Sequence, residues 1–177
     1  MRRFLVLLLV LVATAAQAAD VAVPASVQMG IFANIWRLDR NFKPAAEVTL
    51  GIVYQEEFRS SVATRDEVVA AILALHLPIR FVMINIREAA ALAPHLTNID
   101  VIYITPMRAI DVAAIAKLAR TAHVRTITGV PEYVDAGLAV GIGVRKDRPL
   151  IIINLNASRA EGAAFSAQLL KLARIVE

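Results

Sequence analysis

Cysteine is absent from the 177-residue chain, and aromatic residues make up only 6% of it, with a single tryptophan. The lack of cysteine excludes disulfide bonds, a lipoprotein-type lipid anchor and a cysteine nucleophile. Hydrophobic residues still make up 58% of the chain, which predicts a core of alanine, valine, isoleucine and leucine. A chain of this length can bury such a core in one domain, so its stability must come from the core alone.

Dense clusters of basic residues are lacking as well. The formal charge is +4, and it falls to +2 if Arg2 and Arg3 are removed with the N-terminus. Further along, the basic residues are scattered and have no interleaved aromatics: Arg37, Arg40, Lys43, Arg59, Arg65, Arg80 and Arg87. Nucleic acid is therefore not an expected partner, because it is bound by a concentrated basic surface.

The N-terminus has the three parts of a secretory signal. Met1-Arg2-Arg3 is positively charged, residues 4–13 are apolar, and Ala16-Gln17-Ala18 supplies small residues at a cleavage spacing. We expect residues 1–18 to be a signal peptide cleaved after Ala18, and residues 19–177 to be the mature domain of an exported protein. A retained N-terminal membrane anchor is the alternative, although spanning needs about 20 apolar residues.

Helices and strands are predicted to alternate after this segment, from apolar residues three and four apart and from β-branched runs. The predicted helices are 27–38, 64–77, 87–96 and 108–122, with one or two helical turns at 131–136. The predicted strands are 47–54, 79–86, 101–105, 124–128, 138–145 and 149–154. Thr64 and Glu67 form a capping-box pattern, which places Ser60 and Ser61 in the loop before the second helix.

A final helix is predicted for the C-terminus, with Asn156 as its N-cap and Ser158 and Glu161 in its first turn. Its apolar stripe would consist of Gly162, Phe165, Leu169, Leu172 and Val176.

The alternation predicts an α/β fold, a single three-layer domain whose mostly parallel sheet has helices on both faces. The turn 146–148 is too short for a crossover, so the two strands around it must form an antiparallel edge pair.

No arrangement of residues announces catalysis. The chain lacks a nucleophile-elbow motif and a Ser-x-x-Lys motif, and adjacent Glu56 and Glu57 point in different directions from a loop. His76, His95 and His123 lie near predicted helix ends without the close spacing of zinc ligands. We therefore predict no enzyme, no metal site and no cofactor.

Two features have a functional and a structural interpretation. Gly141-Ile142-Gly143 lacks the third glycine of a nucleotide-binding loop and lies inside a strand, which favours close packing over phosphate binding. Trp36 would be either a partner-facing anchor or a core residue, and the core interpretation is slightly favoured.

The loops at the carboxyl ends of the strands are where such sheets usually bind ligands. Polar residues there could hold an acidic ligand or a partner loop. The candidate ligand or partner residues are Gln55, Asn85, Arg87, Thr105, Arg108, Thr128 and Glu132, with Glu56 nearby.

The end of the chain resembles the YfiR family of periplasmic regulators. In that family the last strand ends in an asparagine and is followed by a Ser-rich, Leu-Leu-x-Leu-Ala-Arg helix. The matching positions here are Ile153, Asn154, Ala157, Arg159, Gly162, Ser166, Leu169, Leu170, Leu172, Ala173 and Arg174. The chain departs from the family in its lack of cysteines and in having Gly141-Ile142-Gly143-Val144 where a Gly-Met-Ile stretch is common, which suggests a diverged member.

The resemblance implies a periplasmic regulatory protein that contacts the periplasmic domain of an inner-membrane signalling protein, such as a diguanylate cyclase (cyclic-di-GMP signalling) or a sensor kinase. Family members are often dimeric, so a homodimer is open. The alternative is a small-ligand-binding periplasmic protein, similar to half of a substrate-binding protein.

Overall fold

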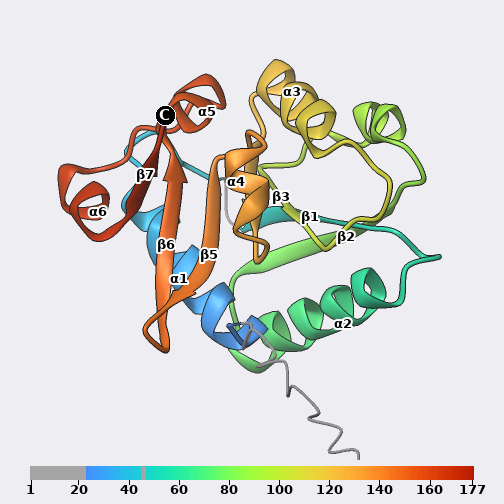
Figure 1. The fold of residues 1–177 in the computed structure, drawn as a ribbon, viewed down its shortest axis with the longest axis horizontal. Coiled ribbons are helices and arrows are strands. Elements are labelled where there is room, and N and C mark those ends of the chain that lie inside the picture. Colours follow the sequence, from blue (N-terminus) through green and yellow to red (C-terminus); the bar gives the residue numbers. More distant parts are fainter. Residues whose placement is uncertain (1–22, 45–46) are drawn as a thin grey trace, which may run out of the picture.

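A computed structural model describes residues 23–44 and 47–177 (Figure 1). The expected signal peptide and its cleavage site lie outside these residues. Within them, no helix combines the length and the apolar character needed to cross a membrane.

A seven-stranded sheet with the order β2-β1-β3-β4-β5-β6-β7 forms the centre of the molecule (Figure 1). The strands are β1 (Val48–Tyr54), β2 (Ile79–Asn85), β3 (Val101–Ile104), β4 (Arg125–Thr128), β5 (Val140–Arg145), β6 (Arg148–Asn154) and β7 (Arg174–Val176). The helices are α1 (Ala25–Arg37), α2 (Arg59–Ala74), α3 (Val112–Ala122), α4 (Glu132–Asp135), α5 (Leu155–Ala160) and α6 (Ala167–Leu172), with a 3-10 helix at Ala89–His95.

Strands β1 to β5 are all parallel, and β5 pairs with β6 in an antiparallel hairpin. The predicted α/β class and the antiparallel pair are thus confirmed. The short strand β7 adds to β6 in a parallel direction, so it lies outside the hairpin. After β1 the chain forms β2 on one side of β1, and it then crosses to form β3 on the other side. The topological switch point therefore lies between β1 and β3.

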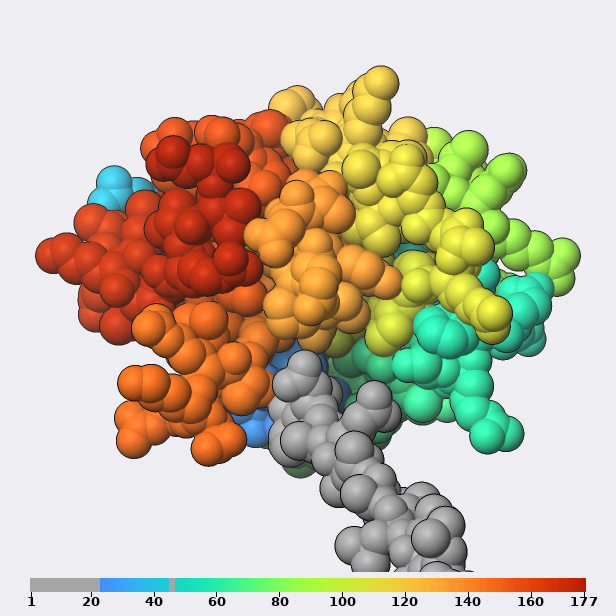
Figure 2. Space-filling view, in the orientation of Figure 1, coloured from blue at the N-terminus to red at the C-terminus, as the bar shows by residue number. Residues whose placement is uncertain are grey.

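Two apolar clusters cover the two faces of the sheet. On one face, α1 and α2 pack on side chains such as Leu50, Ile52 and Tyr103. On the other face, α3 and the 3-10 helix pack on Val53, Ile102 and their neighbours. In the space-filling view, α4 fills the middle, between the C-terminal elements and α3 (Figure 2).

Helix α2 begins earlier than predicted. It starts at Arg59, so Ser60 and Ser61 are in its first turn and the proposed capping residue Thr64 lies inside the helix. Its N-cap is Phe58, which makes no side-chain capping bond. The helix is fixed there by tertiary contact instead, because the buried Ser61 Oγ accepts a hydrogen bond from the backbone N–H of Gln55 at 2.8 Å.

The prediction of a single C-terminal helix is wrong, because the two short helices α5 and α6 and the strand β7 form there. Asn154, not Asn156, caps α5 by accepting from Ala157 N at 2.9 Å, and Gly162 ends that unit with a φ of +91°. Ser166 then caps α6. The expected apolar stripe is consequently split: Leu169 is buried in the core, Leu172 is 67% exposed, and Val176 lies in strand β7.

Candidate functional site

At the switch point, the carboxyl edge of the sheet is closed by buried hydroxyl groups. Ser61 Oγ and Thr105 Oγ1 lie 2.6 Å apart, and Thr105 Oγ1 donates to Val53 O at 2.9 Å. Both side chains are fully buried. The candidate residue Thr105 is therefore engaged inside the protein rather than presented to a ligand.

Thr128 is also internal. Its hydroxyl donates to Ile104 O at 2.9 Å and accepts from Val130 N at 3.0 Å, and the residue is completely buried. These bonds fix the start of the loop that follows β4.

The remaining candidates reach the surface, and several are bonded to one another. Gln55 Oε1 accepts from Arg108 N at 2.9 Å, which ties the loop after β1 to the loop after β3. Asn85 and Glu56 exchange two hydrogen bonds of 3.1 Å. Their neighbouring loops thus form one polar edge at the end of the sheet.

Arg87 and Glu57 continue this edge as an exposed ion pair with an Nε–Oε1 distance of 2.7 Å. A hydrogen bond from its own backbone N–H, followed by the bond from Arg87, lowers the pKa of Glu57. An exposed pair of this kind adds little to stability, so Arg87 can exchange its partner at low cost.

A cavity of about 540 Å³, here called the carboxyl-edge cavity, lies beside these loops on the α1–α2 face. The candidate Glu132 and the helix residue Glu67 line it, and no lysine or arginine within residues 23–44 and 47–177 does. At its base, the buried Tyr103 hydroxyl donates to Gln28 Oε1 at 2.9 Å. Burial raises the pKa of Tyr103, so this hydroxyl stays protonated.

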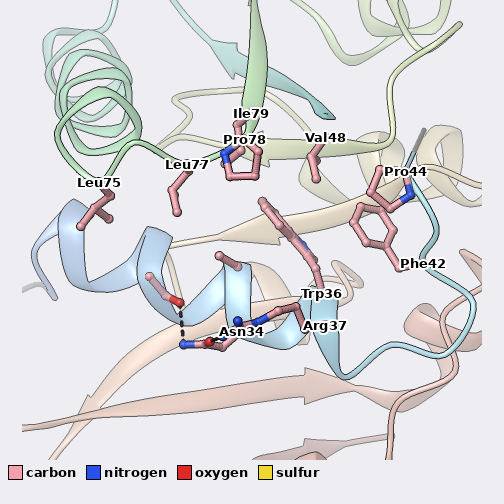
Figure 3. A pocket seen from close by; sticks show the side chains of 12 residues that line it. Asn34, Trp36, Arg37, Phe42, Pro44, Val48, Leu75, Leu77, Pro78 and Ile79 are labelled. Atoms are coloured by element: carbon pink, nitrogen blue, oxygen red, sulfur yellow. Dashed lines mark hydrogen bonds between the residues drawn. The ribbon is translucent and has the colours of Figure 1, made fainter. Parts of the chain in front are cut away.

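A second cavity, the amino-edge pocket, has a volume of about 480 Å³ and lies at the opposite end of the strands. The end of α1, the α2–β2 connection and the first residues of β1 and β2 enclose it (Figure 3). It is lined by Gly30, Ala33, Asn34, Trp36, Arg37, Phe42, Pro44, Val48, Leu75, Leu77, Pro78 and Ile79. Trp36 is only 6% exposed, which confirms the core interpretation, although its ring also forms a wall of this pocket.

Strand β2, at the outer edge of the sheet, and the end of α2 both carry exposed apolar side chains. We call this surface the β2 edge; it consists of Leu73, Leu75, Val82 and Met83, which are 62%, 42%, 40% and 49% exposed. The sequence does not predict this surface, because residues 79–86 have the composition of an inner strand. Its outer position follows from the strand order, for which the local sequence carries no signal.

The histidines and the Gly141–Gly143 glycines have structural roles or positions at helix ends. His76, His95 and His123 lie at or just beyond helix ends, and no group of three potential metal ligands occurs among residues 23–44 and 47–177. A Cβ on Gly141 would lie 2.5 Å from Val134 Cγ2, and one on Gly143 would lie 3.0 Å from Pro131 Cγ. The close-packing interpretation of these glycines is therefore confirmed.

The residues that carried the family resemblance shape the end of the chain. Asn154 and Ser166 are helix caps, and Gly162 provides the left-handed turn between the helices. Leu169 is buried, Leu170 packs against the same cluster, and Arg174 lies 3.6 Å from Asp135. These residues thus determine the local fold at the end of the chain.

Similar folds occur in solved structures at low sequence identity. An ABC domain in complex with L-Trp from Streptococcus pneumonia has a TM-score of 0.66 and 12% identity, covering 86% of this chain and 62% of its own. A conserved domain protein from Vibrio cholerae has a TM-score of 0.65 and 12% identity, covering 87% and 60%. An open, ligand-free substrate-binding protein with adhesive properties from Clostridium difficile has a TM-score of 0.57 and 13% identity. The match covers 84% of this chain and 58% of that protein. The chain thus spans about 60% of the length of these proteins, and the likeness concerns the fold alone.

No curated protein sequence matches the chain. The YfiR/HmsC-like family model, in contrast, matches residues 33–174. The YfiR-like family is periplasmic, regulatory and non-enzymatic, which supports such a role here. Since the match spans more than half of the sequence, the chain belongs to the YfiR/HmsC-like family.

Proposed function

We propose that this protein binds the periplasmic domain of an inner-membrane signalling protein and keeps its cytoplasmic output low. A diguanylate cyclase is the first candidate partner and a sensor kinase the second. The observation that carries the proposal is the family match over residues 33–174. The protein would act by contact and not by catalysis.

The β2 edge is the surface that best suits such a partner. Among the described strands, β2 pairs with β1 alone, so no described strand pairs with the backbone N–H and C=O groups on its other side. An extended segment of a partner can add to such an edge through main-chain hydrogen bonds. The exposed side chains of Val82 and Met83 would add apolar contacts to these bonds.

The polar residues at the end of the same edge would orient the bound partner. Asn85 is the last residue of β2, and Arg87 follows it in an exposed ion pair. Two of the candidate residues from the sequence therefore adjoin the β2 edge. For such contact to restrain the partner, the protein must bind the inactive state of the partner more tightly than the active state.

A substitution at the β2 edge tests this proposal. Met83→Lys places a charge on the surface, and we expect it to weaken partner binding at least tenfold and to raise cellular cyclic-di-GMP as deletion of the gene does. Leu172→Lys is the matched control, because Leu172 is exposed and precedes β7, the strand at the opposite edge of the sheet. Recovery of the partner from solubilised membranes and cyclic-di-GMP levels are the measurements.

Each outcome of this experiment is informative. Release of the partner by Leu172→Lys instead of Met83→Lys would exclude the β2 edge. An unchanged cyclic-di-GMP level after deletion would exclude a cyclase as the partner. Failure to recover any integral-membrane protein would contradict the regulatory proposal as a whole.

Capture of a small ligand is the second candidate function, and the carboxyl-edge cavity favours it. With Glu67 and Glu132 in its lining and no basic residue, the cavity would suit a small cation. A thermal-shift screen of small organic amines would test this, with Glu67→Gln and Glu132→Gln as variants. Stabilisation by an amine that both variants abolish would support ligand capture, whereas the absence of any stabilisation would exclude it for amines.

A further inference from the structure

We propose that the amino-edge pocket binds a small carboxylate with an apolar body, such as a medium-chain fatty acid. The pocket lies at the end of the sheet away from the carboxyl-edge cavity. It adjoins the partner contact proposed above, because Leu75 belongs to both the pocket and the β2 edge.

The size and lining of the pocket suit an apolar body. Its volume of about 480 Å³ falls within the usual range of ligand pockets, roughly 300–1,000 Å³. Leu77, Pro78 and Ile79 line one side of it, and Phe42 and Pro44 lie beside the Trp36 ring (Figure 3). A hydrocarbon chain or an aromatic ring of a ligand would replace water against these side chains.

The charge of the lining favours an anion. Among the described residues that line the pocket, Arg37 is the one charged residue and none is a carboxylate. In the described part of the chain, Arg37 belongs to no ion pair; it donates to Asn34 Oδ1. Asn34 is itself held by donating to Gly30 O at 3.0 Å. The guanidinium is thus positioned at the rim with donors left for a carboxylate.

Trp36 provides a second, independent indication. Its Nε1–H is buried and has no hydrogen-bond partner among residues 23–44 and 47–177. Buried N–H groups in native proteins are rarely left without an acceptor, and such exceptions require an explanation. A ligand oxygen in the pocket would supply the missing acceptor after a small rotation of the Trp36 ring, because Nε1 is closed to solvent in this structure.

These features favour a small molecule over a protein surface as the occupant. The polar groups Asn34 and Arg37 lie together on α1, opposite the apolar residues of the α2–β2 connection (Figure 3). A molecule with one anionic head and one apolar tail matches this division. A second copy of the chain would instead have to place a carboxylate side chain against Arg37, which would make the protein dimeric.

Decanoate binding to the purified domain tests the proposal. Trp36 is the single tryptophan of the chain, so its fluorescence reports directly on the pocket. We expect decanoate to produce a saturable change below its micellar concentration. Decanol has the same chain without the charge and should bind about tenfold more weakly, and decylamine more weakly still. The assay contains no membrane partner, so its result is independent of the proposed regulation.

Two variants locate the site. Arg37→Gln should weaken decanoate binding about tenfold and change decanol binding less than twofold. Gly30→Leu should abolish the binding of both, because a Cβ at this lining position meets no atom within 4 Å and the larger side chain can enter the pocket. Ala113→Leu, on α3 at the opposite face, is the matched control and should bind decanoate normally. Thermal unfolding of each variant verifies that it is folded.

Three results would overturn the proposal. Decanol binding as tightly as decanoate would remove the role of Arg37, and normal decanoate binding by Gly30→Leu would place the ligand elsewhere. A dimer in sedimentation analysis that Gly30→Leu converts to a monomer, together with no decanoate binding, would assign the pocket to a second copy of the chain.

Discussion

Ser61 illustrates how a single hydroxyl fixes the carboxyl edge of the sheet. It accepts a hydrogen bond from Gln55 N at 2.8 Å and contacts Thr105 Oγ1 at 2.6 Å, while the neighbouring Ser60 is exposed. We expect Ser61→Ala to lower the free energy of unfolding by about 1–3 kcal/mol, because the Gln55 amide loses its acceptor. Urea unfolding would measure this loss.

Ser60→Ala is the matched control and should change the stability by less than about 0.5 kcal/mol, as is usual for exposed positions. Equal effects of the two substitutions would contradict the assignment of Ser61 as the residue that joins α2 to the switch point.

Glu161 is a buried carboxyl group at the end of α5. It is fully buried, and its two carboxyl oxygens accept from Thr126 N and Thr126 Oγ1, both at 2.8 Å. Burial raises the pKa of Glu161 to about 8, although the bonds from Thr126 and the charges of Arg120 and Arg125 oppose this rise. In the unfolded chain the pKa would return to about 4.3.

This difference predicts a dependence of stability on pH. Because the folded protein holds the Glu161 proton more tightly than the unfolded chain, the contribution of Glu161 is fully present below about pH 4.3 and is lost as the pH rises to about 8. The loss should be on the order of 5 kcal/mol. Glu161→Gln mimics the protonated group and should remove this slope, as urea unfolding between pH 4 and 8 would reveal. Parallel pH profiles for the two proteins would contradict the assignment.

At the scale of elements, the β5–β6 hairpin has a turn whose sequence does not match its geometry. Lys146 and Asp147 both have a positive φ, of 51° and 58°, as a two-residue type I′ turn requires. This conformation suits Asn-Gly far better than Lys-Asp. We expect the double substitution Lys146→Asn/Asp147→Gly to raise the free energy of unfolding by about 1 kcal/mol. Thermal unfolding would measure the gain, and an unchanged or lowered midpoint would contradict this reading of the turn.

Elements whose signals are local were predicted well from the sequence. Strand 47–54 became β1, and the short turn 146–148 correctly required an antiparallel pair. In each case, composition or loop length decides the structure without help from distant residues. The start of α2 was missed because it depends on a hydrogen bond between Ser61 and Gln55, which a capping-box pattern at Thr64 cannot reveal.

The C-terminal segment and the candidate sites depend on the tertiary structure in the same way. Gly162 reads as part of a helical stripe, yet its φ of +91° ends the helical unit, and the open edge of β6 then receives Arg174–Val176 as β7. The amino-edge pocket joins α1 to the α2–β2 connection, which are about forty residues apart in the sequence. Local patterns therefore located the carboxyl-edge residues but neither this pocket nor the β2 edge.

At the scale of the whole molecule, the two apolar clusters share one sheet. Trp36 belongs to the cluster under α1 and α2, and Leu92 belongs to the cluster under α3 and the 3-10 helix. Successive residues of one strand belong to the two clusters in turn, as Ile52 and Val53 do in β1. Loss of either cluster would leave one face of the sheet uncovered, so neither layer should persist without the other.

Unfolding should therefore be a single cooperative transition, and a cavity on one face should destabilise the other. Leu92 is completely buried, so Leu92→Ala should lower the free energy of unfolding by about 2–5 kcal/mol. Trp36 fluorescence reports on the opposite face, and its urea midpoint should shift by the same amount as that of far-ultraviolet circular dichroism. If Trp36 kept its wild-type midpoint while the dichroism shifted, the two faces would unfold separately. The sheet would then not couple the proposed ligand pocket to the rest of the molecule.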